Sequence, residues 1–200
     1  MTPLRGSQSA VMRWMVRIVT TSLLVGVLAA PAAAYAAGAK PSAAAAPSSS
    51  APFAYLQNYN SGKCIEVPGY STQEGVQLDQ WSCIGQTNEL WRPYHNTSGN
   101  YVFWNEANSY CIEVAGYSTA NGAWIAQWPC TPASAASNFI YYPYLFIGNI
   151  NGKSYYEWAN IYTNKCLNVS GASTANGAKI IQWDCIPTAK NEWFAQPYAS

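Results

Sequence analysis

The chain has 200 residues and a formal net charge of +1, with 10% charged residues, 15 tyrosines and 9 tryptophans. Four of its ten basic residues lie within the first 40 positions, so the sequence from residue 53 onward carries six bases against nine acids, a net charge of −3. A mildly acidic domain binds phosphate poorly, which argues against a nucleic-acid partner.

Residues 1–36 have the organisation of a secretory signal peptide. Three arginines precede a short apolar run from Ile18 to Ala30, and Ala34-Tyr35-Ala36 has the small-x-small pattern of a cleavage site. We expect cleavage after Ala36, with Ala34 as the second choice. The alternative is a membrane anchor, but the apolar run is short and polar residues interrupt it. The sequence therefore predicts a secreted, extracellular protein without a membrane span.

Residues 37–52 consist almost wholly of Ala, Pro, Ser and Gly. Such a segment has too little apolar surface to order itself, so we predict a flexible linker. The remaining residues, 53–200, are enough for one compact domain.

That domain contains an internal repeat. Its six cysteines form three pairs, and the members of each pair are nineteen positions apart. The same order of motifs accompanies each pair: Cys-Ile/Leu-x-Val, Gly-x-Ser-Thr, Gln-Trp-x-Cys and Asn-x-x-aromatic. These motifs define three units at about residues 53–98, 99–150 and 151–200.

The repeat favours one pattern of disulfides among the fifteen that six thiols allow. A chain that repeats itself should also pair its cysteines repetitively, and secretion supplies the oxidising setting. Each bridge would close a loop of about twenty residues and stabilise the fold by about 3 kcal/mol. A metal or redox cluster has little support, because no two cysteines are near neighbours and His95 is the only histidine. We therefore expect no metal or cofactor, and the favoured bridges are Cys64–Cys83, Cys111–Cys130 and Cys166–Cys185.

The local patterns are those of short β-strands. Aromatic and branched residues are interrupted every few positions by Gly, Asn, Ser or Pro, and Ile65-Glu66-Val67 alternates as a strand with one apolar face does. A single unit could not bury its own apolar face. We predict an all-β fold in which three units of about four strands close around a pseudo-threefold axis.

The repeated motifs resemble those of the ricin B-type lectin domain, a β-trefoil with a Gln-x-Trp at the end of each unit. The resemblance covers about residues 53–200, and the chain is similar in particular to the family's secreted bacterial members. It implies carbohydrate binding by three kinds of residue in each unit. An acid two positions after the first cysteine and the Asn of the closing motif bind sugar hydroxyls, and an aromatic residue two positions before the second cysteine lies under the sugar ring. The matching positions here are Glu66, Trp81 and Asn88, then Glu113, Trp128 and Asn138, then Asn168, Trp183 and Asn191.

This combination suits a pyranose. The C–H face of the sugar sits on an indole, and its vicinal hydroxyls need a fixed acceptor beside an amide that both donates and accepts. Stacking and a few partly solvated hydrogen bonds predict weak sites, on the order of millimolar to tens of micromolar. Three sites on one rigid body would act by avidity, so we expect glycans or polysaccharides as partners of a monomeric protein.

Some positions depart from the family pattern. Glu replaces the usual Asp in the first two units, and Asn168 carries no charge. The closing Gln that steadies the acid is replaced by Glu89, Phe139 and Glu192. Glu89 would bring a second carboxylate near Glu66, which requires a shared proton, a cation or outward splaying. We rank the pockets in the order first, third, second.

Several residues have a structural interpretation as well. Each Trp of the Gln-Trp motif could pack on its disulfide, and the two strand acids could be solvated. The closing aromatics Trp91, Tyr141 and Phe194 should fill the core. Tyr70 and Tyr117 are either surface residues or additional sugar contacts.

Two other functions remain as alternatives. One is a protein-binding β-trefoil, an inhibitor or toxin-targeting module that works through its loops and its many aromatic residues. The other is a glycoside hydrolase, for which Glu66 and Glu89 are the only plausible pair of carboxylates. We expect no enzymatic activity.

Overall fold

The computed structural model describes residues 52–95, 100–130 and 141–195. The predicted signal peptide, the linker up to residue 51 and Asn138 lie outside the described residues. Within these ranges the fold is all-β, as predicted, and its only helices are short 3-10 turns. None of those turns has the length or the apolar character needed to cross a membrane.

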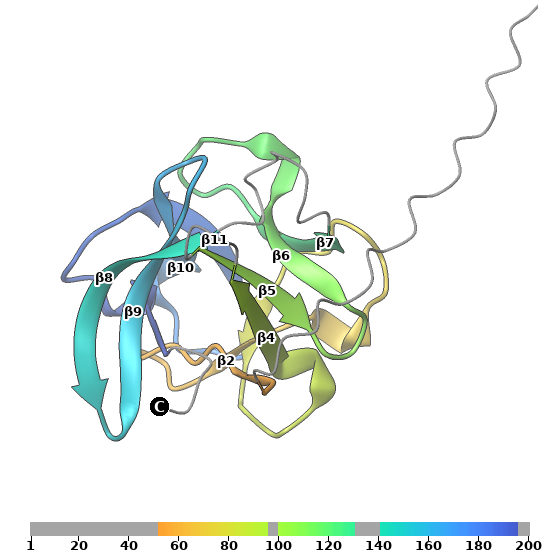
Figure 1. Cartoon of the computed structure of the whole chain (residues 1–200), viewed down its shortest axis with the longest axis horizontal. Helices are drawn as coiled ribbons and strands as arrows, with labels where there is room; N and C mark the ends of the chain where they lie inside the picture. Colours follow the sequence, from red (N-terminus) through yellow and green to blue (C-terminus); the bar gives the residue numbers. More distant parts are fainter. Residues whose placement is uncertain (1–51, 96–99, 131–140, 196–200) are drawn as a thin grey trace, which may run out of the picture. The chain divides into compact units, whose positions relative to one another are not determined.

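The described residues form twelve strands, four in each unit (Figure 1). The strands of the first unit are β1 (Ala54–Tyr55), β2 (Cys64–Glu66), β3 (Asp79–Trp81) and β4 (Leu90–His95). Those of the second unit are β5 (Tyr101–Asn105), β6 (Tyr110–Val114), β7 (Ile125–Pro129) and β8 (Tyr141–Ile150). Those of the third unit are β9 (Lys153–Asn160), β10 (Lys165–Val169), β11 (Ala178–Asp184) and β12 (Trp193–Ala195).

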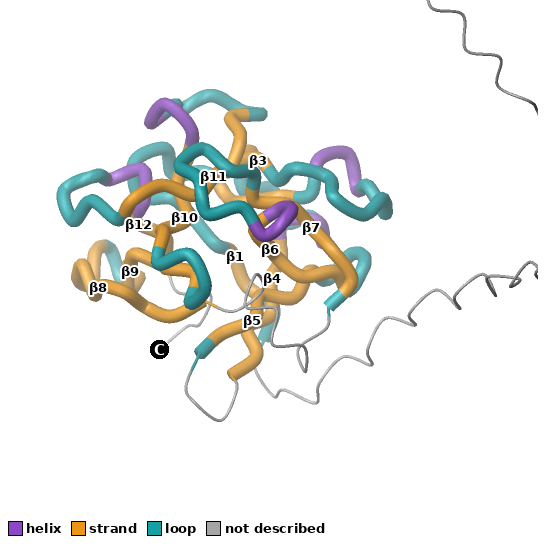
Figure 2. The backbone as a smooth tube through the Cα atoms, turned by 90° about the horizontal axis from the view of Figure 1, so that it is seen from above, coloured by secondary structure: helices purple, strands orange, loops and turns teal. Residues whose placement is uncertain are grey.

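The 3-10 turns also repeat, and they lie at separate places around the strands (Figure 2). One follows the second strand of every unit: η1 (Pro68–Tyr70), η3 (Ala115–Tyr117) and η5 (Ser170–Ala172). Another precedes the last strand of the first and third units: η2 (Thr87–Glu89) and η6 (Lys190–Glu192). Two turns of each kind line the pockets described below.

The outer strands of the three units close into a ring. The antiparallel pairs run β1–β4, β4–β5, β5–β8, β8–β9 and β9–β12. The ring returns to the start of the domain through a bridge between Asn58 and Phe194 and a bond from the Ala195 N–H to the Gln57 carbonyl. Within the described residues this closure joins the two ends of the strand order, as in a barrel.

The inner strands of each unit form a hairpin: β2–β3, β6–β7 and β10–β11. Short bridges join each hairpin to the next, at Lys179 with Asp79, Gln77 with Ala126 and Trp124 with Ile181. The three hairpins therefore associate with one another around the axis, and a residue of one unit borders the hairpin of its neighbour. This three-unit arrangement is the predicted β-trefoil.

The core is built from the same positions of each unit. The closing aromatics Trp91, Tyr141 and Phe194 are buried, as predicted, and the Trp91 Nε1–H donates to the Ile65 carbonyl at 2.9 Å. Ile65 joins this core, while Glu66 lies on the opposite face of β2, in agreement with the alternation in the sequence.

All three predicted disulfides are confirmed: Cys64–Cys83, Cys111–Cys130 and Cys166–Cys185, with Cα–Cα distances of 5.3, 5.1 and 5.0 Å. Each bridge connects the start of one inner strand to the end of the other. It therefore holds the Trp two positions earlier at a fixed place beside the hairpin.

Candidate functional site

The indoles of the Gln-Trp motifs lie at the surface. Trp81, Trp128 and Trp183 are 40%, 39% and 39% exposed. A tryptophan whose main role is to cover a disulfide would be buried, so the exposure favours the interpretation of these indoles as binding platforms.

A glycine turn of the preceding unit supports two of these indoles. A Cβ atom built on Gly75 would lie 3.2 Å from Cζ3 of Trp128, and one on Gly122 would lie 3.8 Å from Cζ3 of Trp183. Both glycines also have positive φ values, 77° and 82°, which disfavour any other residue. The glycine therefore lies close to the six-membered-ring edge of the indole, while the rest of the indole remains exposed to solvent.

The Gln before each Trp holds neighbouring units together. The Nε2 group of Gln80, Gln127 or Gln182 donates to two loop carbonyls of the preceding unit at 2.8–3.0 Å. Its Oε1 atom accepts from a polar side chain of its own unit at 2.6–2.8 Å. These side chains are fully satisfied and buried. Their role is to position the platform, which the sequence alone did not reveal.

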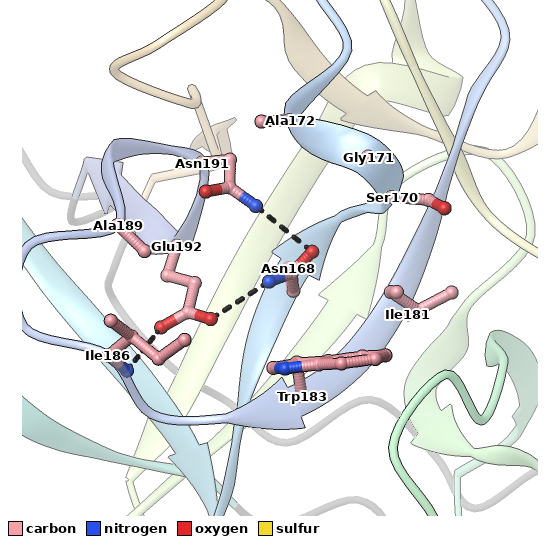
Figure 3. A pocket seen from close by; sticks show the side chains of 10 residues that line it. All are labelled: Asn168, Ser170, Gly171, Ala172, Ile181, Trp183, Ile186, Ala189, Asn191 and Glu192. Atoms are coloured by element: carbon pink, nitrogen blue, oxygen red, sulfur yellow. Dashed lines mark hydrogen bonds between the residues drawn. The ribbon is translucent and has the colours of Figure 1, made fainter.

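The third pocket brings together the residues predicted for it (Figure 3). The Asn191 Nδ2 donates to Asn168 Oδ1 at 3.1 Å and to the Val169 carbonyl at 3.1 Å. In turn, Asn168 Nδ2 donates to Glu192 Oε1 at 2.8 Å, and Glu192 Oε2 accepts from the Ile186 N–H at 2.7 Å. The two amides therefore stand in a fixed orientation above the flat Trp183 indole.

Glu192 takes the place of the family's closing Gln and reverses the usual distribution of charge. The carboxylate stands on the closing turn η6, and the amide of Asn168 stands on the strand. Burial raises the pKa of Glu192, although its hydrogen bonds with Ile186 and Asn168 favour the ionised form. The third pocket thus retains one acid, and its carboxylate is hydrogen-bonded to Asn168 and Ile186 instead of facing the open side of the cavity.

The first pocket also assembles its predicted residues. The Asn88 Nδ2 donates to Glu66 Oε2 at 3.0 Å and to the Val67 carbonyl at 2.9 Å. Glu66 is only 9% exposed, so it is not the solvated strand acid of the structural interpretation. Trp81 lies on the facing strand, where it pairs with Cys64.

A third acid, Asp79, shares this pocket. It lies directly opposite Glu66 in the register of β2 and β3, so the two side chains project to the same face of the hairpin. Burial, and next the charge of Asp79, raise the pKa of Glu66 to about 7. The Lys179 Nζ from the third unit lies 2.9 Å from Asp79 Oδ2, which favours ionised Asp79 against the effect of its burial.

Glu89 turns away from the strand acid. Its Oε2 atom accepts from the N–H groups of Ile84 and Gly85 at 2.9 and 3.2 Å, and the side chain is fully buried. Outward splaying is thus the outcome for Glu89, and the charge of Asp79 has a larger effect on the pKa of Glu66 than that of Glu89. A buried Glu89 is also a poor partner for Glu66 in glycoside hydrolysis.

The second pocket is described only in part, because Asn138 lies outside the described residues. Glu113 is 6% exposed and lies opposite Ala126, two positions before Trp128. Burial raises the pKa of Glu113 to about 7. No acid stands at the position that Asp79 occupies in the first pocket.

The two fully described pockets are shallow surface cavities of about 330 Å³ in the first unit and about 320 Å³ in the third. Tyr70 lines the first pocket and its hydroxyl donates to Gln86 Oε1, so it is a pocket residue, whereas Ala172 holds the equivalent place in the third. Among residues 52–95, 100–130 and 141–195, no group of three His, Cys, Asp or Glu side chains is arranged to hold a metal ion.

Comparison with known families agrees with this geometry. The family model described as "Ricin-type beta-trefoil lectin domain-like" matches residues 46–128 and 144–200, which is more than half of the chain. The chain belongs to this family. The match spans all three units and includes both fully described pockets.

Solved structures with the same fold include a designed threefold-symmetric protein, ThreeFoil, which is 27% identical, with a TM-score of 0.63 over 71% of this chain and 95% of that one. A ricin B-like lectin from Macrolepiota procera, solved in complex with lactose, is 15% identical, with a TM-score of 0.58 over 73% and 94% of the two chains. An exo-β-1,3-galactanase from Clostridium thermocellum is 22% identical, with a TM-score of 0.64, but the match covers 30% of that chain and 74% of this one. These likenesses show that the chain shares its fold with all three proteins.

Proposed function

We propose that this protein is a secreted, monomeric carbohydrate-binding protein without enzymatic activity, which binds glycans or polysaccharides weakly at up to three pockets and gains strength by avidity. The observation that carries the proposal is the repeated pairing of a half-exposed indole with a fixed amide in a shallow cavity. Such a surface matches the C–H face and the vicinal hydroxyls of a pyranose.

The first and third pockets contribute Glu66, Trp81 and Asn88, and Asn168, Trp183 and Asn191. Single sites of this size hold a sugar by one stacking contact and a few hydrogen bonds, which corresponds to about millimolar to tens of micromolar dissociation constants. A polymer that reaches two pockets converts the second contact into an intramolecular event. Polysaccharides should therefore bind more tightly than free sugars.

The test is an array that carries galactose, N-acetylgalactosamine, lactose, xylan and β-1,3-galactan. We expect the wild-type chain to bind at least one class, with a stronger signal on the polymer than on its monomer. The triple variant Trp81→Ala, Trp128→Ala and Trp183→Ala should lose that binding by more than about a hundredfold, since each indole supplies the apolar contact of its site. Unchanged binding by the triple variant would contradict the proposal.

One observation favours the alternative of protein binding. The hairpin of β8 and β9 exposes three large apolar side chains, Tyr144, Leu145 and Phe146, on one strand. Clustered exposed aromatics are common at protein interfaces. A protein ligand that binds the triple Trp variant as well as the wild type, and loses binding in Phe146→Ser, would support this second function.

A further inference from the structure

Trp124 is a fourth exposed indole, which the family motifs do not include. It is 57% exposed, more than any of the three platform tryptophans. It stands four positions before Trp128, where the first unit has Gln77 and the third has Lys179. The position therefore varies between units while the platform does not.

This position borders the pocket of the neighbouring unit. Trp124 pairs with Ile181 by an antiparallel bridge, as Lys179 pairs with Asp79. Residues directly opposite each other in an antiparallel pair project to the same face of the sheet, about 5 Å apart at Cβ. The ion pair of Lys179 with Asp79 at 2.9 Å demonstrates this contact in the first pocket.

By the same register, the Trp124 side chain lies on the face of Ile181, and Ile181 lines the third pocket. In Figure 3, Ile181 lies above one end of the Trp183 indole, and Glu192 lies toward the other end. The bridge to Ile181 therefore places Trp124 near the end of the Trp183 indole that is farther from Glu192.

The backbone that carries Trp124 is fixed to the third unit. The Gly122 N–H donates to the Gln182 carbonyl at 2.8 Å, and the Gln182 N–H donates to the Ala123 carbonyl at 2.9 Å. Asn121 adds two further bonds to Asp184, at 2.7 and 3.0 Å. The backbone that carries the second indole is therefore fixed before any ligand arrives, so only the side-chain freedom of Trp124 is lost on binding.

We propose that Trp124 forms a second sugar-contacting surface of the third pocket, so that this pocket binds an oligosaccharide of at least two residues. One ring lies on Trp183 with its hydroxyls on Asn168 and Asn191, and the chain continues past Ile181 onto Trp124. This inference rests on the proposed function and specifies its ligand. The first pocket has Lys179 at the equivalent place, so it lacks this extension.

The test uses a third-pocket protein, the full chain with Trp81→Ala and Trp128→Ala. Its binding is measured on an array of mono-, di- and trisaccharides from galactose, glucose and xylose series. The test variant adds Trp124→Gln, a residue that the first unit itself carries at this position. The control adds Tyr117→Ala, because Tyr117 is 56% exposed and belongs to the second unit, whose own pocket Trp128→Ala has already disabled.

We expect Trp124→Gln to weaken binding of di- and trisaccharides by about three- to tenfold, the worth of one aromatic contact, and to change monosaccharide binding by less than about twofold. Tyr117→Ala should change neither. Equal effects of Trp124→Gln on mono- and oligosaccharides, or no effect on either, would overturn the inference and leave the proposed function intact. A third-pocket protein and a wild-type chain that bind no sugar on the array would contradict both.

Discussion

In the first pocket the strands carry two acids, Glu66 and Asp79, whereas in the third pocket they carry none, and each pocket has one further acid on its closing turn, Glu89 or Glu192. Both pockets have the same indole, the same closing Asn and the same backbone bonds from that Asn to a Val carbonyl. The two units thus share the indole, the closing Asn and its hydrogen bond, and they differ in the charged groups on the strands. Two sites built on one plan should therefore respond differently to pH and to substitution.

The largest effect should come from removing one of the disulfides. Replacing Cys166 and Cys185 by Ala opens a loop of about twenty residues and should lower the free energy of unfolding by about 3 kcal/mol. Guanidinium chloride unfolding measures this loss. Binding by the third-pocket protein should fall with it, since Trp183 is two positions from the bridge.

The matched control for that prediction is the same replacement at Cys64 and Cys83. It should cost a similar free energy but impair the first pocket and not the third. Loss of both pockets in each variant would show that the units do not hold their sites separately.

The next effect is a difference in pH dependence. Burial and Asp79 raise the pKa of Glu66 to about 7, and the carboxylate is the form that accepts two hydroxyl hydrogen bonds. Affinity of a first-pocket protein, the chain with Trp128→Ala and Trp183→Ala, should therefore fall by about tenfold from pH 8 to pH 6, as its ionised fraction falls. The third-pocket protein, which has Asn168 at this place, should change by less than about twofold in the same titration.

A double-mutant cycle sharpens the comparison within the third pocket. Asn168→Asp alone places a second carboxylate against that of Glu192. Glu192→Gln alone leaves a single acceptor oxygen for two donors, so either Asn168 Nδ2 or the Ile186 N–H loses its hydrogen bond. Each single variant of the third-pocket protein should bind oligosaccharide about five- to tenfold more weakly, the worth of one buried hydrogen bond. The double variant, with the charge on the strand, should recover to within about threefold of the parent.

Additive losses in that cycle would mean that the two residues do not act as a pair. Calorimetric titration of parent, single and double variants measures the coupling directly. The buried environment makes a stability check necessary, so each variant is first compared by thermal unfolding.

The smallest effect is a shift in a titration midpoint. Asp79→Asn removes a negative charge beside Glu66, so the pKa of Glu66 should fall and the midpoint of first-pocket binding should move to lower pH. The exposed Glu106→Gln serves as a control of equal charge change. A midpoint that stays in place, or moves by the same amount in both variants, would assign the raised pKa to burial alone.

Local patterns in the sequence predicted the parts of the fold that repeat. The cysteine spacing specified all three bridges, and the alternation of Ile65, Glu66 and Val67 placed the acid on the pocket face. The three closing aromatics were correctly assigned to the core. These features depend on residues close together in one unit, which is why a single sequence reveals them.

Contacts between units could not be predicted in the same way. The pairing of Asp79 with Lys179 joins residues one hundred positions apart and depends on the register between two hairpins. For Glu89 the sequence left a shared proton, a cation or outward splaying open, and the structure shows splaying because the N–H groups of Ile84 and Gly85 bind its carboxylate. The contribution of Trp124 to another unit's pocket has the same origin in a bridge between hairpins.

The most direct test of carbohydrate binding is an NMR titration that follows the indole N–H signals of the full chain as an array-selected oligosaccharide is added. The account predicts that signals of Trp81 and Trp183 move first, and that buried Trp91 and Trp158 stay in place. Signals that all stay in place with the tightest array ligand, or that move only outside the pockets, would contradict it.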